Sequence, residues 1–167
     1  MSIVGIIMGS KSDFDIAGET VKLLNKFGVQ SDLIISSAHR SPKKTSEWSK
    51  SAKDNGYSVI IAFAGAAAHL AGAVASETNV PVVAVPISAT SLSGLDALLS
   101  MVQMPGGVPV AVMAIGKAGA VNAALFACQI IAISDPQMYD KLESYREDMR
   151  RKIACDDEDL KAIVEKL

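Results

Sequence analysis

The sequence predicts an α/β fold in which a five-stranded parallel sheet lies between two layers of helices. Short runs rich in β-branched residues alternate with longer helix-compatible runs over the first 134 residues. This alternation is typical of βαβ units, and apolar strands of this kind suit a parallel sheet covered on both faces. The chain has 167 residues, 50% of them hydrophobic, which is enough for one domain with a sizeable core.

The elements can be placed one by one. The expected strands are residues 3–8, 32–36, 58–64, 82–85 and 109–114, and the helices fall between them. Residues 13–27 carry apolar side chains at close to a 3.6-residue period, and Gly28 follows as a typical helix stop. Ser41 and Pro42 are suited to open the next helix as its N-cap and first residue.

Together these elements predict a three-layer α/β/α, doubly wound sheet with the flavodoxin-like strand order, in which the second strand lies beside the first. We expect a single domain over residues 1–167, with an α/β core over 1–134 and a helical C-terminal extension over 135–167. An apolar stripe marks one side of that extension: Met138, Leu142, Tyr145, Met149 and Ile153.

Charge is unevenly distributed along the chain. Between residues 67 and 134 the only Asp, Glu, Lys or Arg residues are Glu77, Asp96 and Lys117. Such a stretch cannot form the solvated outside of a small monomer, and residues 118–133 are apolar nearly all round, as in a completely buried helix. We therefore predict a homo-oligomer, with the C-terminal helix docked on a partner or on the flank of its own subunit.

Composition excludes several classes of protein. The net charge is −2 and no cluster of Lys or Arg stands out, so neither nucleic acid nor a membrane surface is an expected partner. No apolar run approaches the roughly 20 residues that span a bilayer, and the N-terminus lacks signal-peptide features, so we expect a cytoplasmic protein. Cys128 and Cys155 have neither pair spacing nor nearby histidines, which predicts free thiols and no metal site.

Ligands of open parallel sheets bind outside the carboxyl ends of the strands, so the loops there are the candidate site. The first loop, "MGSKSD", offers Gly9 for close approach, the hydroxyls of Ser10 and Ser12, and a helix N-terminus. It fits either a phosphate cradle or a plain capped turn with Ser12 or Asp13 as the N-cap.

The second loop, "SSAHRSP", favours the phosphate interpretation. In the flavodoxin-like order Arg40 reaches the ligand of the first loop, and guanidinium suits a phosphate monoester because it binds in a bidentate fork. His39, beside it, has an unperturbed pKa near ~6.5 and can accept and return a proton at neutral pH. We therefore interpret His39 as a proton-transfer residue rather than a packing residue.

Two later loops add contacts. "FAGAAAHLAG" is rich in small residues that let a ligand approach, and His69 there is a second polar contact. "PISATSLSGLD" holds hydroxyls that either bind a ligand or cap the following helix, and for Ser93 we favour capping. Lys117, in a Gly-rich segment after the fifth strand, is the only cation in the apolar middle of the chain.

Several familiar sites are excluded. The segment before Gly116 and Lys117 lacks the first glycine of a nucleoside-triphosphate P-loop, and Ala118 replaces its hydroxyl. The G-x-G-x-x-G motif and acid of a dinucleotide site are missing. Ala64 and Gly65 stand where a phospho-acceptor receiver domain needs aspartate. A module that binds a flavin or another nucleotide phosphate stays open, although Phe63 is the only aromatic available for stacking.

The motifs together resemble those of one family, the bacterial class I 5-(carboxyamino)imidazole ribonucleotide mutases of purine biosynthesis. The similarity covers roughly residues 3–133, through "IIMGSKSD", "SAHRSP", "GYSVIIA", "AAAHLAG", "SLSGLDALLSMVQMPGGVPV" and "AIGKAGAVNAAL". The related class II carboxylases usually have lysine after the loop histidine and lack the A-H-L segment. Arg40 and His69 therefore favour class I.

The resemblance implies conversion of N5-carboxyaminoimidazole ribonucleotide to its 4-carboxylate isomer by a homo-octamer, without ATP, metal or organic cofactor. It implies that His39 transfers protons while the small-residue loop traps CO2. By position, the residues implied for phosphate and ribose are Ser10, Ser12, Asp13, Ser37 and Arg40. The third loop adds Gly65, Ala66, His69 and Leu70 as expected substrate contacts.

The third loop departs from the family pattern. The family usually reads G-A-G-G-A-A-H-L-P-G there, whereas this chain has Phe63, Ala66 and Ala71 in place of two glycines and a proline. If the family glycine at position 66 has a positive φ or lies against the substrate, a methyl group there adds strain or fills part of the CO2 pocket. A catalytically weakened relative that keeps ligand affinity is therefore a second hypothesis beside the mutase.

Overall fold

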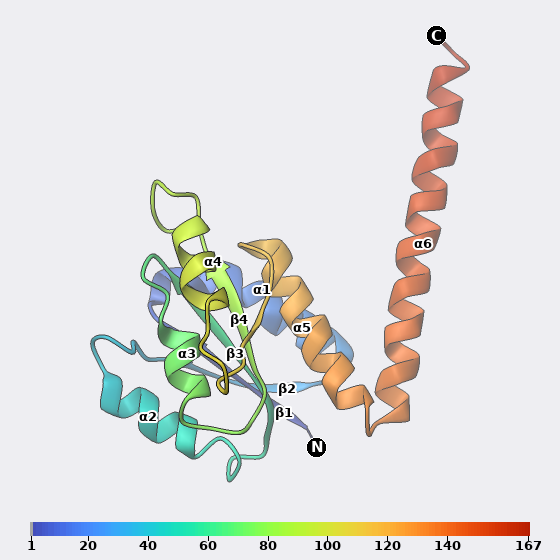
Figure 1. Cartoon of the computed structure of the whole chain (residues 1–167). Helices are drawn as coiled ribbons and strands as arrows, with labels where there is room; N and C mark the ends of the chain where they lie inside the picture. Colours follow the sequence, from blue (N-terminus) through green and yellow to red (C-terminus); the bar gives the residue numbers. More distant parts are fainter. Residues whose placement is uncertain (1) are drawn as a thin grey trace.

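The computed structural model describes residues 2–167 and contains a parallel five-stranded sheet between helices (Figure 1). The sheet order is β2-β1-β3-β4-β5, which confirms the predicted flavodoxin-like order. In chain order the elements are β1 (Ile3–Met8), a 3-10 turn η1 (Lys11–Asp13), α1 (Phe14–Phe27), β2 (Gln30–Ile35), α2 (Pro42–Lys50), β3 (Tyr57–Gly65), α3 (Leu70–Ala75), β4 (Val82–Ile87), α4 (Leu95–Val102), β5 (Ala111–Val112), α5 (Lys117–Ala132) and α6 (Pro136–Val164).

The strands are apolar on both faces because helices cover both. Alternate residues such as Ile6, Ile61 and Val85 join the core beneath α1 and α5. The intervening residues, such as Ile60 and Ala84, pack against the α2, α3 and α4 side. This two-sided burial is the reason that the strand sequences are continuously apolar rather than alternating.

Strand and helix ends differ modestly from expectation. β1 has the predicted bounds, while β2 begins two residues earlier than predicted and β4 ends two residues later. β5 contains only Ala111–Val112 instead of 109–114. It is an edge strand that pairs with β4 alone, and Pro109 has no N–H to donate to the ladder.

Helix starts were predicted more closely than their capping side chains. α2 begins at Pro42 with Ser41 in the N-cap position, but the Ser41 side chain makes no capping hydrogen bond. The expected helix over residues 13–27 is divided into the turn η1 and α1, and Gly28 ends it in a left-handed conformation. Its carboxyl end is also held by Lys141 of α6, whose ammonium donates to the Phe27 carbonyl at 2.8 Å.

Residues 118–133 were predicted to be completely buried, but in the single chain only part of this segment is buried. One side of α5, including Ala120, Ala124 and Cys128, is buried against the sheet and α1, whereas Leu125 and Phe126 are only partly buried. The α5 start also touches the preceding loop: a Cβ on Gly119 would lie 1.7 Å from the Ala114 carbonyl oxygen. Only glycine fits this approach.

The C-terminal helix α6 is confirmed, but only its first part docks on the chain. Met138 and Leu142 are buried against the α1 and α5 side, and Tyr145 packs at the edge of that core. Met149 and Ile153, farther along the predicted stripe, are exposed. Figure 1 shows that the rest of α6 extends away from the sheet toward the C-terminus.

Two expectations concern membranes and cysteines. Within residues 2–167, no helix is both long and apolar enough to cross a bilayer. Cys128 and Cys155 are free thiols, as predicted, the first buried and the second exposed.

Candidate active site

The loops that follow β1, β2, β3 and β4 surround one cavity of about 330 Å³ at the carboxyl edge of the sheet. A volume of this size suits a small-molecule ligand. All ten predicted site residues line it: Ser10, Ser12, Asp13, Ser37, His39, Arg40, Gly65, Ala66, His69 and Leu70. Ala64 and Ala67 also line it, within the small-residue loop that was expected to let a ligand approach. Sequence reasoning did not find Ala38 and Ala89, because isolated small apolar residues in loops carry no signal of their own.

The first loop is held by reciprocal hydrogen bonds between its two ends. The Ser10 N–H donates to the Asp13 carboxylate at 3.0 Å, and the Ser10 hydroxyl oxygen accepts from the Ser12 N–H at 3.4 Å. The capped-turn alternative named Ser12 or Asp13. Ser10 caps the turn η1 with its side chain, whereas Asp13 holds the N-cap position of α1 without a capping side-chain hydrogen bond. The Ser12 hydroxyl donates to Ser10 and is exposed to the cavity.

Asp13 is the buried acid of the site, with 7% of its surface exposed. Burial raises the pKa of its carboxyl above the usual value, and hydrogen bonds from the Ser10 N–H and the Ser12 hydroxyl act in the opposite direction, together with the charge of Arg40. Both carboxylate oxygens therefore already accept hydrogen bonds from the first loop, and the residue also lines the cavity.

Arg40 joins the first two loops, as the predicted strand order required. Its guanidinium donates to the Gly9 carbonyl at 3.0 Å, and its own N–H donates to the Ser37 hydroxyl at 3.3 Å. A guanidinium has five donors, so one contact leaves most of the fork free for an anion. The serines of the first loop and Arg40 therefore line the same cavity, and Arg40 contacts that loop at Gly9.

His39 and His69 meet across the cavity. His39 Nε2 and His69 Nδ1 lie 2.9 Å apart, and the two rings stand nearly perpendicular, at 87°. One nitrogen donates the shared hydrogen and the other accepts it, so at least one ring must be neutral. The two histidines predicted separately thus form one dyad, which joins the second loop to the third.

The third loop forms a tight wall. A Cβ on Gly65 would lie 2.6 Å from Ala89 Cβ and 3.1 Å from the Ile87 carbonyl oxygen, so only glycine fits there. Ala66, where the family usually has glycine, has a φ of 54°, in the left-handed region that favours glycine. The strain expected for alanine at this position is therefore present in the backbone.

Phe63 does not face the cavity. Its side chain is fully buried in the core between the sheet, α1 and α5. It cannot stack on a flavin ring, and histidine supplies the only aromatic rings among the cavity residues.

The fourth loop contributes less than expected. Ser93 is not the cap of α4; Gly94 holds that position, and Ser93 instead has a φ of 53°. The Thr90 hydroxyl donates to Asp96 at 2.7 Å, and neither it nor the loop's serines line the cavity. Lys117 lies elsewhere, beside Phe14 and Asp15.

A family comparison agrees with the geometry. Residues 3–152 match the family model described as AIR carboxylase. The chain belongs to the AIR carboxylase family. No cluster of three or more His, Cys, Asp and Glu side chains suited to a metal ion occurs within the described residues 2–167.

Individual members of the AIR carboxylase family are closely similar. The N5-carboxyaminoimidazole ribonucleotide mutase of Pyrococcus horikoshii is 50% identical over 90% of this chain and 84% of its own. The mutase of the same name from Pseudomonas aeruginosa is 48% identical over 87% of this chain and 89% of its own. The crystal structure of Treponema denticola PurE is 30% identical, superposes with a TM-score of 0.87, and covers 96% of this chain and 99% of its own.

The strained backbone at Ala66 generates a prediction. Ala66→Gly removes a left-handed alanine, which costs about 1–2 kcal/mol, against a glycine entropy loss of about 0.5–1 kcal/mol. We expect the free energy of unfolding in urea to stay constant or rise by up to about 1.5 kcal/mol. The neighbouring Ala67→Gly, whose φ is negative, is the matched control and should lose about 0.5–1 kcal/mol. Equal losses in both variants would contradict strain at Ala66.

Proposed function

We propose that this chain catalyses the conversion of N5-carboxyaminoimidazole ribonucleotide to 4-carboxy-5-aminoimidazole ribonucleotide in purine biosynthesis. The observation that carries the proposal is the His39–His69 dyad, which stands in the same cavity as Arg40 and the serine loop. A phosphate site and a proton-transfer group are both needed for this reaction, and one cavity supplies both. The relatives that are about half identical bear the name of this mutase.

The phosphate and ribose are assigned to the first two loops. Arg40 donates to the phosphate, with hydroxyls of Ser10, Ser12 and Ser37 beside it. These residues line the same cavity, and the Arg40–Gly9 bond orients the guanidinium before substrate arrives. Asp13 accepts from a ribose hydroxyl while it holds the loop.

The chemistry requires one proton to be given and one to be removed. Protonation of the carbamate nitrogen breaks the N–C bond and releases CO2 next to a nucleophilic aminoimidazole ring. The ring carbon C4 then attacks CO2, and its hydrogen must leave as a proton. His39 gives the first proton and takes the last, so it returns to its starting state without ATP, metal or organic cofactor.

His69 and the small-residue loop have separate parts in this scheme. His69 holds the His39 ring in place and determines which ring nitrogen carries hydrogen. Gly65, Ala66 and Leu70 form the wall against which CO2 is held between the two steps. The Gly65–Ala89 approach leaves that wall without room for a larger side chain, which favours recombination over escape.

The alternative of a flavin-binding module is less well supported. The burial of Phe63 removes the only aromatic side chain that the sequence offered for stacking. A catalytically weakened relative differs from the mutase only in rate, and turnover measurements on the parent protein distinguish the two.

We also propose that the chain acts in the cytoplasm as a homo-octamer. An apolar face remains uncovered on α4 and the loop before it, where each side chain is about half exposed or more: Leu92, Leu95, Leu99 and Val102. A continuous apolar face of this kind is typical of contacts between subunits. It lies in the segment whose lack of charge predicted an oligomer.

Arg40 generates a prediction about affinity. Arg40→Ala should weaken binding of the 4-carboxylated ribonucleotide by about 1.5–3 kcal/mol, roughly 10- to 150-fold, because a charge-assisted contact to phosphate is lost. Isothermal titration calorimetry measures the change. Lys43→Ala, which removes an exposed cation of α2 outside the cavity, is the control and should bind as the parent does. Unchanged affinity in Arg40→Ala would exclude the phosphate assignment.

His39 generates a prediction about turnover. His39→Asn keeps a similar size and some hydrogen bonding but cannot titrate near neutral pH, so packing and proton transfer are separated. Turnover should fall at least a hundredfold (~10²), with ligand affinity near that of the parent. Circular dichroism and calorimetry verify that the variant is folded and binds. Near-normal turnover by the folded variant would falsify the role, and an unfolded variant would support a packing role instead.

A further inference from the structure

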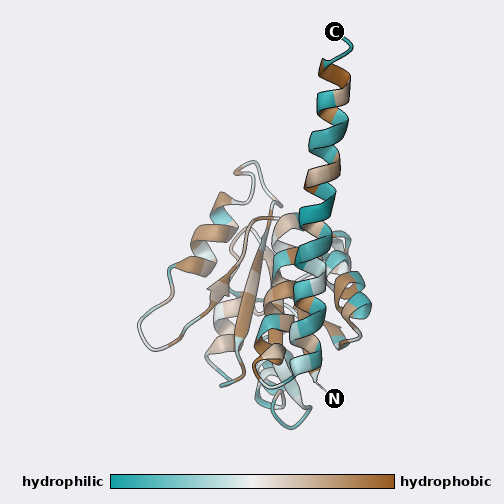
Figure 2. Ribbon diagram, turned by 90° about the vertical axis from the view of Figure 1, so that its right-hand side faces the viewer, coloured by the Kyte–Doolittle hydropathy of each residue, from teal (hydrophilic) through white to brown (hydrophobic). Residues whose placement is uncertain are grey.

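The distal part of α6 has no partner within the described chain. Beyond Tyr145 the helix leaves the core, and both views of the chain show its C-terminal half projecting from the rest of the molecule (Figures 1 and 2). We call residues 146–164 the arm. The family model ends at residue 152, within the arm.

The arm continues the apolar stripe of the docked part of the helix. At 100° per residue, its apolar positions fall on the same side as buried Met138 and Leu142. Figure 2 shows apolar bands along the projecting helix, separated by hydrophilic ones. Each of these side chains is more than half exposed: Met149, Ile153, Leu160, Ile163 and Val164.

An isolated arm is a poor structure in water. From Met149 to Val164 it extends about 24 Å at 1.5 Å per residue. Lone helices of this length are marginal, and most helix stability in proteins comes from packing of an apolar side. We therefore expect the apolar stripe of the arm to pack against another surface, which does not belong to the described residues of the same chain.

The charges of the arm identify that surface. Three basic residues in succession, 150–152, are followed by four acidic residues in succession, 156–159. The two groups lie on either side of the middle of the arm. When two such helices lie antiparallel, the basic group of each faces the acidic group of the other, so the helix is complementary to a second copy of itself.

We propose that the arm pairs antiparallel with the arm of a second copy of this chain. A register with Met149 of each copy opposite Leu160 of the other covers both stripes. It also places Tyr145 opposite Val164, so the pairing continues the packed part of the helix. Such a contact is isologous, because both copies use the same surface.

In this register the basic residues that flank the stripe of one copy face acidic residues that flank the stripe of the other. Arg150 and Asp157 are two turns apart on one flank of the stripe, and Lys152 and Asp159 are two turns apart on the other. Arg150 then meets Asp157 of the second copy with an offset of two residues, about 3 Å along the axis, as does Lys152 with Asp159. Asp156 is the one acid within the stripe. It is opposite residue 153 of the second copy and therefore one residue from the Lys152 of that copy. Each contact occurs twice by symmetry.

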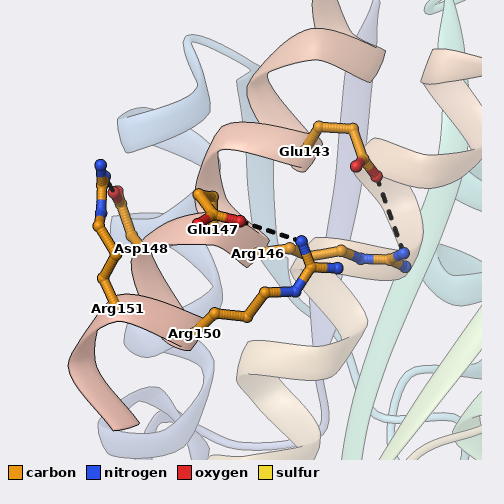
Figure 3. A network of polar contacts seen from close by, with 6 residues as sticks. All are labelled: Glu143, Arg146, Glu147, Asp148, Arg150 and Arg151. Carbon is orange, nitrogen blue, oxygen red and sulfur yellow. Dashed lines mark hydrogen bonds and ion pairs between the residues drawn. The ribbon is translucent and has the colours of Figure 1, made fainter. Parts of the chain in front are cut away.

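Arg150 and Asp157 each have a partner within the arm, and each keeps capacity for a second one: Lys161 donates to Oδ2 of Asp157 at 2.6 Å, and Oδ1 takes no part in that bond. Figure 3 shows Arg150 paired with Glu147 and Arg151 paired with Asp148, each within one turn. The Arg150 guanidinium keeps donors for a second acceptor. Arg151 and Glu158 point away from the stripe, so they take no part in the proposed contact.

The apolar face of α4 is a weaker candidate for covering the arm. Asp96 is the only charged residue within α4. That face therefore has no counterpart for the basic and the acidic group of the arm. A second arm offers both.

Cys155 provides a probe at the centre of the arm. It is exposed and lies off the stripe, whereas Cys128 is buried, and burial raises the pKa of the Cys128 thiol to about 11. A nitroxide reagent near neutral pH therefore labels Cys155 alone. Paired helix axes lie about 8–10 Å apart, so two labels in the proposed register come within about 10–20 Å.

The test measures label-to-label distances in the full-length protein by electron paramagnetic resonance. The parent should show the short distance. Arg150→Glu and Asp157→Lys should each reduce the paired fraction about tenfold, because two attractive contacts become repulsive. An equal mixture of these two variants should regain it, since the carboxylate introduced at position 150 of one chain then meets the ammonium introduced at position 157 of the other.

Matched controls separate pairing from loss of helix. Arg151→Glu removes an intrahelical pair and changes the net charge as Arg150→Glu does, but on the outward side, and should keep the short distance. Glu158→Lys makes the same change of charge as Asp157→Lys on the outward side. Because Asp157→Lys also breaks the intrahelical pair with Lys161, Lys161→Gln, which breaks that pair alone, completes the control and should keep the short distance. Light scattering on the same samples reports assembly through the rest of the chain.

Three results would overturn the proposal: no short distance in the parent, equal loss in the outward controls, or no recovery in the mixture. An arm docked on α4 of another copy, on a different protein or on nothing gives the first of these. The proposal does not rest on the proposed reaction, and mutase activity of the same samples is measured independently.

Discussion

The site depends on the register of three parallel strands. Met8 at the end of β1 is level with Ile35 in β2 and with Phe63 in β3. β1 and β2 therefore end at one height, and β3 continues only two residues farther, to Gly65, so loops that are far apart in sequence start near one another. The Arg40–Gly9 bond and the His39–His69 dyad both follow from this alignment. A shift of the register would separate the loops and reverse the side chains between the two cores.

The strands and the neighbouring first two loops could be predicted, because the apolar pattern of the sequence and the usual strand order of such sheets led to the same arrangement. Continuous apolar runs indicated buried parallel strands, and the flavodoxin-like order placed the second loop beside the first. Arg40 reaches the first loop for that reason. The His39–His69 contact could not be predicted, because a 2.9 Å distance between two loops depends on side-chain rotamers and loop paths, which periodicity does not encode. The short edge strand and the cap of α4 were missed on similar grounds: the first follows from Pro109 at a sheet edge, and the second from a left-handed glycine.

The departures from the family pattern acquire different meanings in the structure. Phe63 replaces a family glycine but points into the core, where its fully buried ring packs among aliphatic side chains. Ala71 is also fully buried, in the core on the other face. Ala66 alone lines the cavity with a positive φ. Of the three substitutions, only this one acts directly on the wall proposed to hold CO2.

The proposed reaction requires this wall to keep the released CO2 beside the ring while His39 donates one proton and removes the other. Retention of CO2 can be followed with N5-carboxyaminoimidazole ribonucleotide labelled with ¹³C in its carboxylate, in buffer with excess unlabelled bicarbonate. Carbon-13 NMR then reports which carboxyl carbon reaches C4. We expect the product to form and to retain the ¹³C label. Product carrying unlabelled carboxylate from the buffer, or release of the decarboxylated ribonucleotide without product, would contradict this role of the wall.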